Sequence, residues 1–480
     1  MFKKYNLSDS AVIICVIFSL IYISPIVLTN VYYTDDMARS IYGYAWDNDG
    51  RAITSLLMMA ISGGGKILNI SPYTNIFSSL ILSFSGWVLC YVIDLCGKER
   101  VHPAAFLILT SPFMLENLTY KYDSLPMSIS VLAVILPFLF FNRKIFPIIA
   151  AIGICVTMLT YQASAIIFAM VFSLKITITY LKDGVFDLKK YSYITLATSI
   201  ISLILLRVSN YIYPPKYSGR NELIFNSDNT FDELMKNIGK AIELTAAAFS
   251  FHMTIAMVLI SAFFVLSSLR IIKDSNNKIA SFLFIFIIIL TILSYPLINI
   301  LLLNPWWTSR VFLGFPVAII AMIAIIHVYY VKSARYLSVF LCAISLPMMA
   351  AYANATKSQS DYSQEITRDI FSHIESRDKG IVVNGAMPLS DEVKLSMSSY
   401  PIFKRIILPY MNNGWSWGGH FISRMGYIDR GNYILGKKRE GVIKDICNIN
   451  IKHSMHNYEI RESRDYVLID FKKTKCLPTK

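Results

Sequence analysis

Long apolar runs separated by short polar turns dominate the chain from residue 11 to residue 352. An α-helix needs about 20 apolar residues to cross a hydrocarbon core of about 30 Å. Eleven runs approach that length, at residues 11–33, 74–96, 103–115, 125–141, 145–159, 163–181, 193–208, 252–271, 279–303, 311–331 and 336–352. The pattern therefore predicts an all-α polytopic membrane protein with about 11 transmembrane helices.

Three segments outside the predicted helices are long enough to fold. Residues 34–73 include, within 51–68, an apolar helical pattern that ends at three glycines, 63–65, and suits a helix lying in the membrane interface. Residues 209–250 form a second outer loop. The composition turns polar near residue 353, which predicts a transmembrane domain at 1–352 and a small α+β domain at 353–480. In the latter, a helix is predicted near 361–376, and short strands at 382–383, 406–408 and 466–469.

The basic residues alternate with the predicted helices. If the N-terminus lies inside, every inner turn is basic, whereas the outer turns contain mainly acidic residues and few cations. The inner cations are Lys3, Lys4, Lys98, Arg100, Arg143, Lys144, Lys182, Lys189, Lys190, Arg270, Lys273, Lys278, Lys332 and Arg335. Because Lys and Arg hold loops in the cytoplasm, this alternation predicts an inner N-terminus and an outer C-terminal domain.

The composition excludes several other classes of protein. Of 480 residues, 55% are hydrophobic and 16% are charged. Soluble proteins contain roughly 25% charged residues, so a water-soluble enzyme is excluded. The inner turns account for part of the formal net charge of +14. No nucleic-acid-binding motif accompanies that charge, and we expect no nucleic-acid partner.

Two of the seven cysteines, Cys447 and Cys476, lie in the predicted outer domain. The other five fall in or beside predicted helices, where a thiol behaves as a small apolar group. In an oxidising compartment, the two outer cysteines would pair as a disulfide. Two free thiols are the alternative. No spacing of Cys and His indicates a zinc site.

Two adjacent carboxylates, Asp35 and Asp36, follow the first predicted helix directly. Like charges this close at the membrane–water boundary should raise the pKa of one of them, which is a useful property in a general base. The alternative is the cap of a helix with outward-facing charges, since Asp is a favoured N-cap residue. The spacing alone leaves both interpretations open.

A second polar cluster lies in the short outer turn at residues 116–126. It places Lys121, Tyr122 and Asp123 between two predicted helices. Tyr and Lys are often interface anchors, but a lysine beside an aspartate is more polarity than anchoring requires.

Further polar groups lie at the same predicted face. Residues 160–164 interrupt an apolar stretch, and residues 304–310 contain two tryptophans and Arg310. Arg207 lies inside the outer end of a predicted helix, where an ionisable group is costly and therefore a functional candidate. Tryptophans at this depth are commonly belt residues. Together, however, the clusters suit a lipid-borne anionic substrate, because arginine binds phosphate through two hydrogen bonds and aromatic rings stack on sugars.

These motifs together resemble the serotype-converting O-antigen glucosyltransferases of Gram-negative bacteria and their phages. The resemblance rests on Tyr-Thr-Asp-Asp at 33–36, Gly-Arg at 50–51 after Trp46, the Tyr-Lys-Tyr-Asp-Ser-Leu-Pro run at 120–126 and Leu-Thr-Tyr-Gln-Ala-Ser at 159–164. It covers mainly the first 170 residues. The rest matches only in its plan of a long outer tail after the last helix. The family resembles the GT-C class, in which an acidic residue of the first outer loop is the usual catalytic base.

The resemblance implies an inverting glucosyltransferase of the bacterial inner membrane. Its donor would be undecaprenyl phosphate glucose, and its acceptor would be the O-antigen repeat units of lipopolysaccharide on the periplasmic side. A lipid-glucose synthase and a flippase would supply the donor. The leaving group is a phosphomonoester rather than a nucleotide diphosphate, so we expect neither a metal nor another cofactor.

The motifs and the resemblance together nominate the site residues. Asp35 or Asp36 would deprotonate an acceptor hydroxyl, and Asp123 is the next candidate for the general base. The cations expected to hold the donor phosphate are Lys121, Arg207 and Arg310. The other candidate substrate-binding residues are Arg39, Trp46, Arg51, Tyr122, Tyr161, Gln162 and Trp307.

Two other functions fit a membrane protein with these outer loops. An O-antigen polymerase or ligase usually relies on arginine-rich outer loops, but here the middle loop contains Arg220 alone. A polysaccharide flippase or transporter would show paired repeats and charges at mid-membrane. We find no internal repeat, and the polar clusters gather at one face. The glycosyltransferase is therefore the favoured interpretation.

Overall fold

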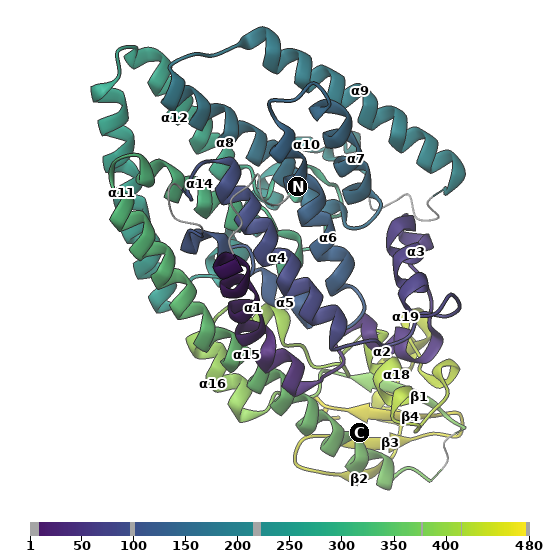
Figure 1. The fold of residues 1–480 in the computed structure, drawn as a ribbon. Coiled ribbons are helices and arrows are strands. Elements are labelled where there is room, and N and C mark those ends of the chain that lie inside the picture. The colour runs from purple at the N-terminus through teal and green to yellow at the C-terminus, as the bar shows by residue number, and fades with distance from the viewer. Residues whose placement is uncertain (1–8, 97–100, 215–221, 376–377, 414, 477–480) are drawn as a thin grey trace.

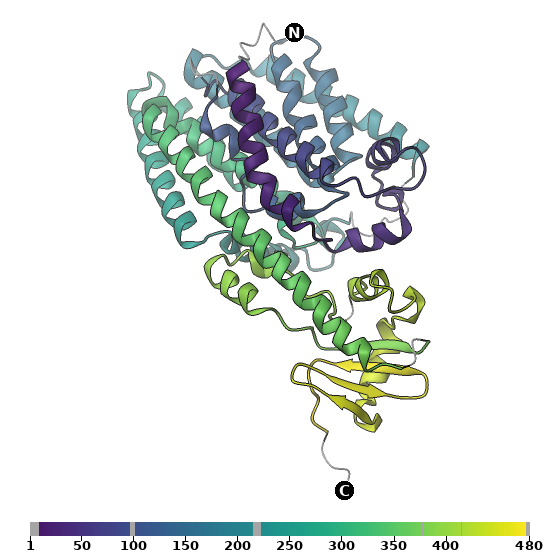
Figure 2. The same cartoon turned by 60° about the horizontal axis from the view of Figure 1, so that its bottom comes forward.

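A bundle of apolar helices continues at one end into a small domain with a four-stranded sheet (Figure 1). The computed structural model describes residues 9–96, 101–214, 222–375, 378–413 and 415–476. Figure 2 shows that the beginning of the first helix and the sheet lie at opposite ends of the molecule.

Six helices are long and apolar enough to cross a membrane, by length and composition, in the described ranges. They are α1 (Asp9–Thr29), α4 (Tyr73–Val92), α8 (Ala165–Asp183), α9 (Leu188–Ile212), α11 (Phe251–Asp274) and α15 (Val331–Ser372). Of the five shorter apolar helices in the described ranges, four lie in predicted membrane runs: α6 (Ser124–Ile135), α7 (Phe146–Met158), α12 (Lys278–Leu293) and α14 (Phe315–Tyr329). Each of these ten helices overlaps a predicted run. How many of them cross a membrane stays a prediction.

The predicted helix at 103–115 is wrong. This stretch forms the 3-10 helix η3 (Pro103–Phe106) and turns, and helix α5 (Met114–Thr119) begins only at its end. Every residue from 104 to 128 is buried inside the protein. A segment enclosed by other helices is as apolar as one facing lipid, so the apolar run alone did not distinguish the two.

The loop after α1 contains short helices that position the polar clusters. The helix predicted within 51–68 is α3 (Ala52–Ile61), and it ends where the glycines were predicted to end it, because Gly63 and Gly64 have φ angles of 88° and 92°. Such angles favour glycine. The remaining elements of the bundle are α2 (Asp35–Tyr42), η2 (Asp47–Asp49), η4 (Leu136–Phe140), η5 (Gln162–Ser164), η7 (Ile224–Asn226), α10 (Thr230–Ala247), α13 (Leu297–Leu301) and η8 (Ser309–Val311).

Close backbone contacts hold the buried segment 104–128 against α4. A Cβ atom added at Gly86 would lie 1.9 Å from the carbonyl oxygen of Ala105, so only glycine allows this approach. Nearby, the hydroxyls of Ser19 on α1 and Ser83 on α4 are joined by a hydrogen bond of 2.6 Å. Small residues and interhelical hydroxyl bonds are typical of helix packing in membranes.

The last long helix does not end where the composition turns polar. Helix α15 runs without a break through residue 353 to Ser372 and includes the first part of the helix predicted near 361–376. The change in composition at 353 therefore does not mark a break in the backbone. One continuous helix joins the bundle to the C-terminal domain (Figure 2).

The C-terminal sheet has the strand order β1-β4-β3-β2. Its strands are β1 (Gly380–Asn384), β2 (Ile451–Ser454), β3 (Glu459–Glu462) and β4 (Tyr466–Asp470), and only the β1–β4 pair is parallel. The accompanying helices are α16 (Asp391–Ser399), α17 (Phe403–Ile406), α18 (Trp417–Arg424), η9 (Arg430–Asn432), α19 (Gly436–Lys444) and η10 (Ile446–Asn448). A disulfide joins Cys447 to Cys476.

The two strands predicted at 382–383 and 466–469 lie within β1 and β4. The strand predicted at 406–408 is wrong, because α17 ends at Ile406 and no strand follows it there. Phe403, Ile406 and Ile407 instead belong to the apolar core of the helical bundle. Their hydrophobicity reflects docking between the two parts of the chain.

Candidate functional site

The acidic pair lies where the helical bundle meets the C-terminal domain. Between α1 and α2 the backbone turns at Thr34, whose φ of 36° is unusual for a β-branched residue. The hydroxyl of Thr34 donates to the hydroxyl of Tyr120 (3.0 Å), which ties this turn to the buried segment 104–128. Helix α18 of the C-terminal domain packs on α2 (Figure 1).

Asp36 is fully buried and serves as an acceptor for backbone amides. Its Oδ2 accepts from the amide of Lys121 (2.9 Å) and that of Tyr33 (3.3 Å), and its Oδ1 accepts a longer bond from Tyr122 (3.4 Å). Burial, opposed by these amides, raises the pKa of Asp36 from 3.8 to about 7. Its side chain therefore holds two loops together and has no exposed oxygen to offer a substrate.

Asp35 points the other way and is accessible, with 37% of its side chain exposed. Its Oδ1 accepts a hydrogen bond from the indole Nε1 of Trp417 (3.1 Å), and its Oδ2 lies 3.9 Å from a guanidinium nitrogen of Arg310. Partial burial acts to raise the pKa of Asp35, but the charges of Arg310 and Arg39 and the bond from Trp417 outweigh it and lower this pKa. Asp35 is therefore ionised at neutral pH.

Arg310 is anchored by Glu116, which lies on α5. Glu116 Oε2 accepts from the hydroxyl of Ser309 (2.6 Å) and from the backbone amide of Arg310 (2.9 Å). The guanidinium of Arg310 donates to the hydroxyl of Tyr120 and lies 3.9 Å from both Glu116 and Asp35. It keeps 21% of its side chain exposed, so a fixed cation stands beside the accessible carboxylate.

Asp123 is enclosed by its own partners. It accepts from the guanidinium of Arg39 and from the indole Nε1 of Trp46 (2.6 Å), and Arg51 lies 3.7 Å away. The guanidinium of Arg39 also covers the ring of Trp46 at 4.0 Å. Both oxygens of Asp123 are therefore occupied, and only 5% of the side chain is exposed.

Tyr161 connects the two partly exposed arginines. Its hydroxyl donates to the carbonyl of Arg310 (3.2 Å), and Arg51 lies over its ring at 4.9 Å. Arg51, like Arg310, has 21% of its side chain exposed. Gln162 begins η5 directly after Tyr161 and is half-buried. The polar break at 160–164 thus contacts both arginines through Tyr161.

Lys121 and Tyr122 act mainly in packing. The ammonium of Lys121 donates to the side chain of Asn30 and lies 5.0 Å from the ring centre of Tyr32, and burial lowers the pKa of Lys121. The ring of Tyr122 is buried in an apolar cluster with Trp46. The contacts of both side chains are thus made within the protein.

Two predicted substrate-binding residues stand apart from this cluster. Arg207 is exposed on α9, and within the described ranges no hydrogen bond or ion pair joins it to the other candidates. Trp307 is half-buried against Phe312 at a ring distance of 6.3 Å.

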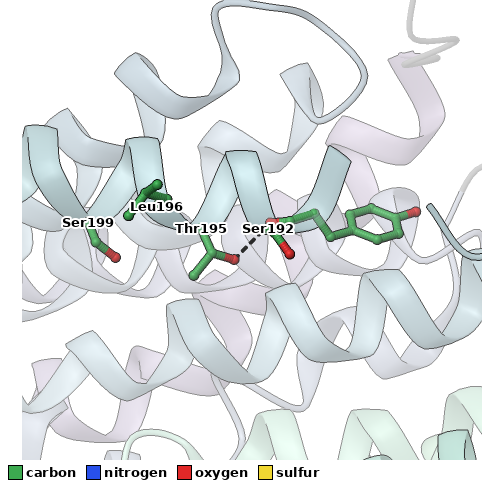
Figure 3. A pocket seen from close by; sticks show the side chains of 5 residues that line it. Ser192, Thr195, Leu196 and Ser199 are labelled. Carbon is green, nitrogen blue, oxygen red and sulfur yellow. Dashed lines mark hydrogen bonds between the residues drawn. The ribbon is translucent and has the colours of Figure 1, made fainter. Parts of the chain in front are cut away.

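Figure 3 shows a hollow on α9, and none of the candidates lines it. The residues lining it are Tyr191, Ser192, Thr195, Leu196 and Ser199.

The accessible groups of the site define its chemistry. Asp35, as an ionised carboxylate, can accept a proton from a hydroxyl. Arg51 and Arg310 can hold an anion, because a guanidinium donates two parallel hydrogen bonds to phosphate or carboxylate oxygens. Among the described residues, no three His, Cys, Asp or Glu side chains converge as a metal site requires.

Three residues of the site were not among the candidates derived from the sequence. Glu116 and Tyr120 belong to the predicted polar turn, and their burial beside Arg310 distinguishes them from interface anchors. Trp417 comes from the C-terminal domain, 382 positions away from Asp35 along the chain. No local pattern connects residues that far apart, so the sequence contained no signal for this contact.

The chain is similar to known proteins over the part that contains the site residues of the helical bundle. A family model described as "Glucosyl transferase GtrII" matches residues 24–329. A protein of Salmonella phage P22, described as "Uncharacterized 55.3 kDa protein in gtrB 5'region", is 30% identical over 167 residues. That alignment covers 34% of this chain and 34% of the phage protein, about a third of each. No solved structure matches the chain.

Proposed function

Because the chain belongs to the GtrII family of glucosyl transferases, we propose that it transfers glucose from undecaprenyl phosphate glucose to O-antigen repeat units. The matched residues 24–329 include every candidate of the bundle, from Asp35 to Arg310. The observation that most favours this activity is an accessible ionised carboxylate beside two partly exposed arginines, at one end of a helical bundle.

Asp35 is the general base in this proposal. The proton of an acceptor hydroxyl passes to its carboxylate while the hydroxyl oxygen attacks the anomeric carbon of glucose. The bond between that carbon and the phosphate oxygen breaks, and undecaprenyl phosphate leaves with the bonding electrons. The new bond forms on the face opposite the leaving group, so the anomeric configuration inverts. Asp36 positions the loop, since its oxygens are bonded to backbone amides.

Arg310 and Arg51 hold the leaving phosphate. The charge on the phosphate grows as the glycosidic bond breaks, and a fixed cation stabilises this charge without reorganising. The carboxylate of Glu116 keeps Arg310 in place by accepting a hydrogen bond from the backbone amide of Arg310. The ring of Tyr161 supports the guanidinium of Arg51. Because these two arginines can stabilise the charge on the leaving phosphate, the proposed step includes no metal ion.

The site faces the periplasm in this proposal, and the N-terminus faces the cytoplasm. The alternation of basic turns supports this orientation, as does a disulfide in the C-terminal domain, because disulfides persist in oxidising compartments. A reporter that is active only in the periplasm, fused after Lys480, should be active. Activity of a cytoplasm-only reporter at the same place would contradict the orientation.

The activity is tested with the full chain in lipid vesicles, supplied with undecaprenyl phosphate glucose and unglucosylated O-antigen from the strain that encodes it. We expect Asp35→Asn to reduce transfer by about 10²–10⁴-fold, the usual effect of removing a general base. The control is Asp361→Asn, a carboxylate on α15 with 50% exposure and a single lysine partner. Transfer by Asp35→Asn at the wild-type rate would show that the base lies elsewhere.

A further inference from the structure

Two tryptophans of the C-terminal domain lie beside the proposed base. Trp417 donates its indole N–H to Asp35 (3.1 Å). Trp415 packs against Trp417 with the ring centres 4.9 Å apart and the rings at 72°. Both side chains are only half-buried. An accessible aromatic pair therefore adjoins the accessible carboxylate.

The tryptophan pair is held firmly against the bundle. The hydroxyl of Tyr410 donates to the carbonyl of Tyr32 (2.9 Å), two residues before Thr34. At the end of α18, the guanidinium of Arg424 covers the ring of Tyr32 at 3.6 Å. These contacts lie on either side of Trp417 along the chain, so the position of Trp417 relative to Asp35 is fixed from both directions.

The three aromatic candidates of the bundle that lie in this cluster cannot offer a free ring to a sugar. Trp46, Tyr122 and Tyr161 are all buried, with 1%, 1% and 4% exposure. Arginines already cover the rings of Trp46 and Tyr161. Tyr44 is 42% exposed, but the guanidinium of Arg39 lies over its ring at 5.0 Å. The accessible ring that bonds to Asp35 is that of Trp417 in the C-terminal domain, with Trp415 packed against it.

We propose that Trp415 and Trp417 form the surface on which the acceptor saccharide stacks, with its reacting hydroxyl directed to Asp35. This inference rests on the proposed function and assigns its acceptor site. Trp417 is in addition a positioning residue, because its N–H holds the carboxylate that receives the proton.

A saccharide suits this surface better than a lipid does. The C–H groups on one face of a pyranose ring pack on the flat apolar face of an indole, while the hydroxyls at its edge need polar partners. Asp35 supplies such a partner at the edge of the tryptophan pair. An acyl chain would gain nothing from a carboxylate that is held ionised beside Arg310.

The inference also divides the two substrates between two parts of the chain. Arg51 and Arg310, which hold the donor phosphate, lie within residues 24–329 that the family model matches. Trp415 and Trp417 lie outside that range. The donor and the acceptor are thus bound by different parts of the chain in this inference.

The test measures the acceptor dependence of transfer at saturating undecaprenyl phosphate glucose, with unglucosylated O-antigen as the titrated acceptor. We expect Trp415→Ala to raise the acceptor KM roughly ten-fold or more, with little change in the donor KM, and Trp415→Phe to restore much of the loss. The matched control is Leu395→Ala, which truncates an exposed apolar side chain on α16 of the same domain. Thermal unfolding of each variant checks its folding.

The outcomes separate this inference from the proposed function. If the wild-type chain transfers no glucose, the proposed function is wrong and this inference falls with it. If the wild type transfers glucose and a folded Trp415→Ala variant keeps the wild-type acceptor KM, the inference alone is wrong. A rise in the donor KM instead of the acceptor KM would also overturn it.

A second variant tests the positioning role. Trp417→Phe keeps an aromatic ring but removes the N–H that stabilises the Asp35 carboxylate. The pKa of Asp35 should rise, so the acid limb of the pH profile of kcat/KM should move to higher pH. The cations facing Asp35 are Arg310, Arg39 and Arg51, the titratable tyrosines that interact with it are Tyr44 and Tyr120, and all remain in place. An unmoved acid limb would contradict this role of Trp417.

Discussion

The buried carboxylate of Asp36 should make the stability of this protein depend on pH in an unusual direction. Burial raises the pKa of Asp36 from 3.8 to about 7. Between these two values, the folded chain keeps a proton that the unfolded chain has lost. The folded state is therefore favoured on the acid side, and this contribution is lost as the pH rises towards 7. An aspartate with a lowered pKa has the opposite effect, because its contribution to stability is lost as the pH falls.

The perturbation is Asp36→Asn, which removes the ionisation and keeps the shape. The difference between the two pKa values corresponds to about 4 kcal/mol at full effect. Asparagine can still accept the bonds from Lys121 and Tyr33 with one oxygen. It loses the longer bond from Tyr122, at a constant cost of about 0.5–1.5 kcal/mol. The variant should thus gain stability relative to the wild type as the pH rises from 4 to 8.

The assay is unfolding of the detergent-solubilised full chain, with the wild type and the variant compared at each pH. Taking the difference cancels the other titrating groups. Asp35→Asn is the control, because the pKa of Asp35 lies below its ordinary value of 3.8. The stabilisation from its ionised form is therefore complete above that pH and is lost only below it, so the difference between the wild type and Asp35→Asn should stay constant from pH 5 to pH 8. If the difference between the wild type and Asp36→Asn is the same at pH 5 and pH 8, the burial argument for Asp36 is wrong.

Three further predictions concern stability. Asp123→Asn should destabilise the fold by about 3–5 kcal/mol, because it leaves the guanidinium of Arg39 buried without its anion; an unchanged unfolding midpoint would contradict this. Gly86→Ala should cost roughly 1–3 kcal/mol or more, since the new Cβ would clash with the carbonyl of Ala105. Gly239→Ala on α10, where nothing lies within 4 Å, should be tolerated, and equal effects of the two glycine changes would refute the packing argument. Replacing both cysteines of the C-terminal disulfide by serine should lower the stability of that domain by roughly 3–4 kcal/mol for a loop of 29 residues. Proteolysis of the domain with and without reductant measures this loss.

The sequence by itself located the helices and the polar clusters. Ten apolar runs form helices, because a helix satisfies its own backbone hydrogen bonds wherever an apolar stretch leaves water. Polar residues stood out in the sequence wherever they interrupted apolar runs. These are the turn at 116–126, the break at 160–164 and Arg310. Local composition was enough for these features, because each depends on residues close together along the chain.

Hydrophobicity did not reveal what covers a residue. The apolar run at 103–115 is enclosed by other helices, and the run at 406–408 docks onto the bundle. The change to a polar composition at residue 353 likewise does not interrupt helix α15. Lipid, protein core and interdomain contact all favour the same side chains, so only the tertiary structure could distinguish them.

The roles of the two adjacent aspartates were also decided by tertiary structure. Successive residues on a helix point about 100° apart, so Asp36 faces the buried turn while Asp35 faces the C-terminal domain. Their sequence neighbours are nearly the same, and no local pattern separates a structural carboxylate from a reactive one. The difference comes from Arg310 and Trp417, which only the folded chain brings to Asp35.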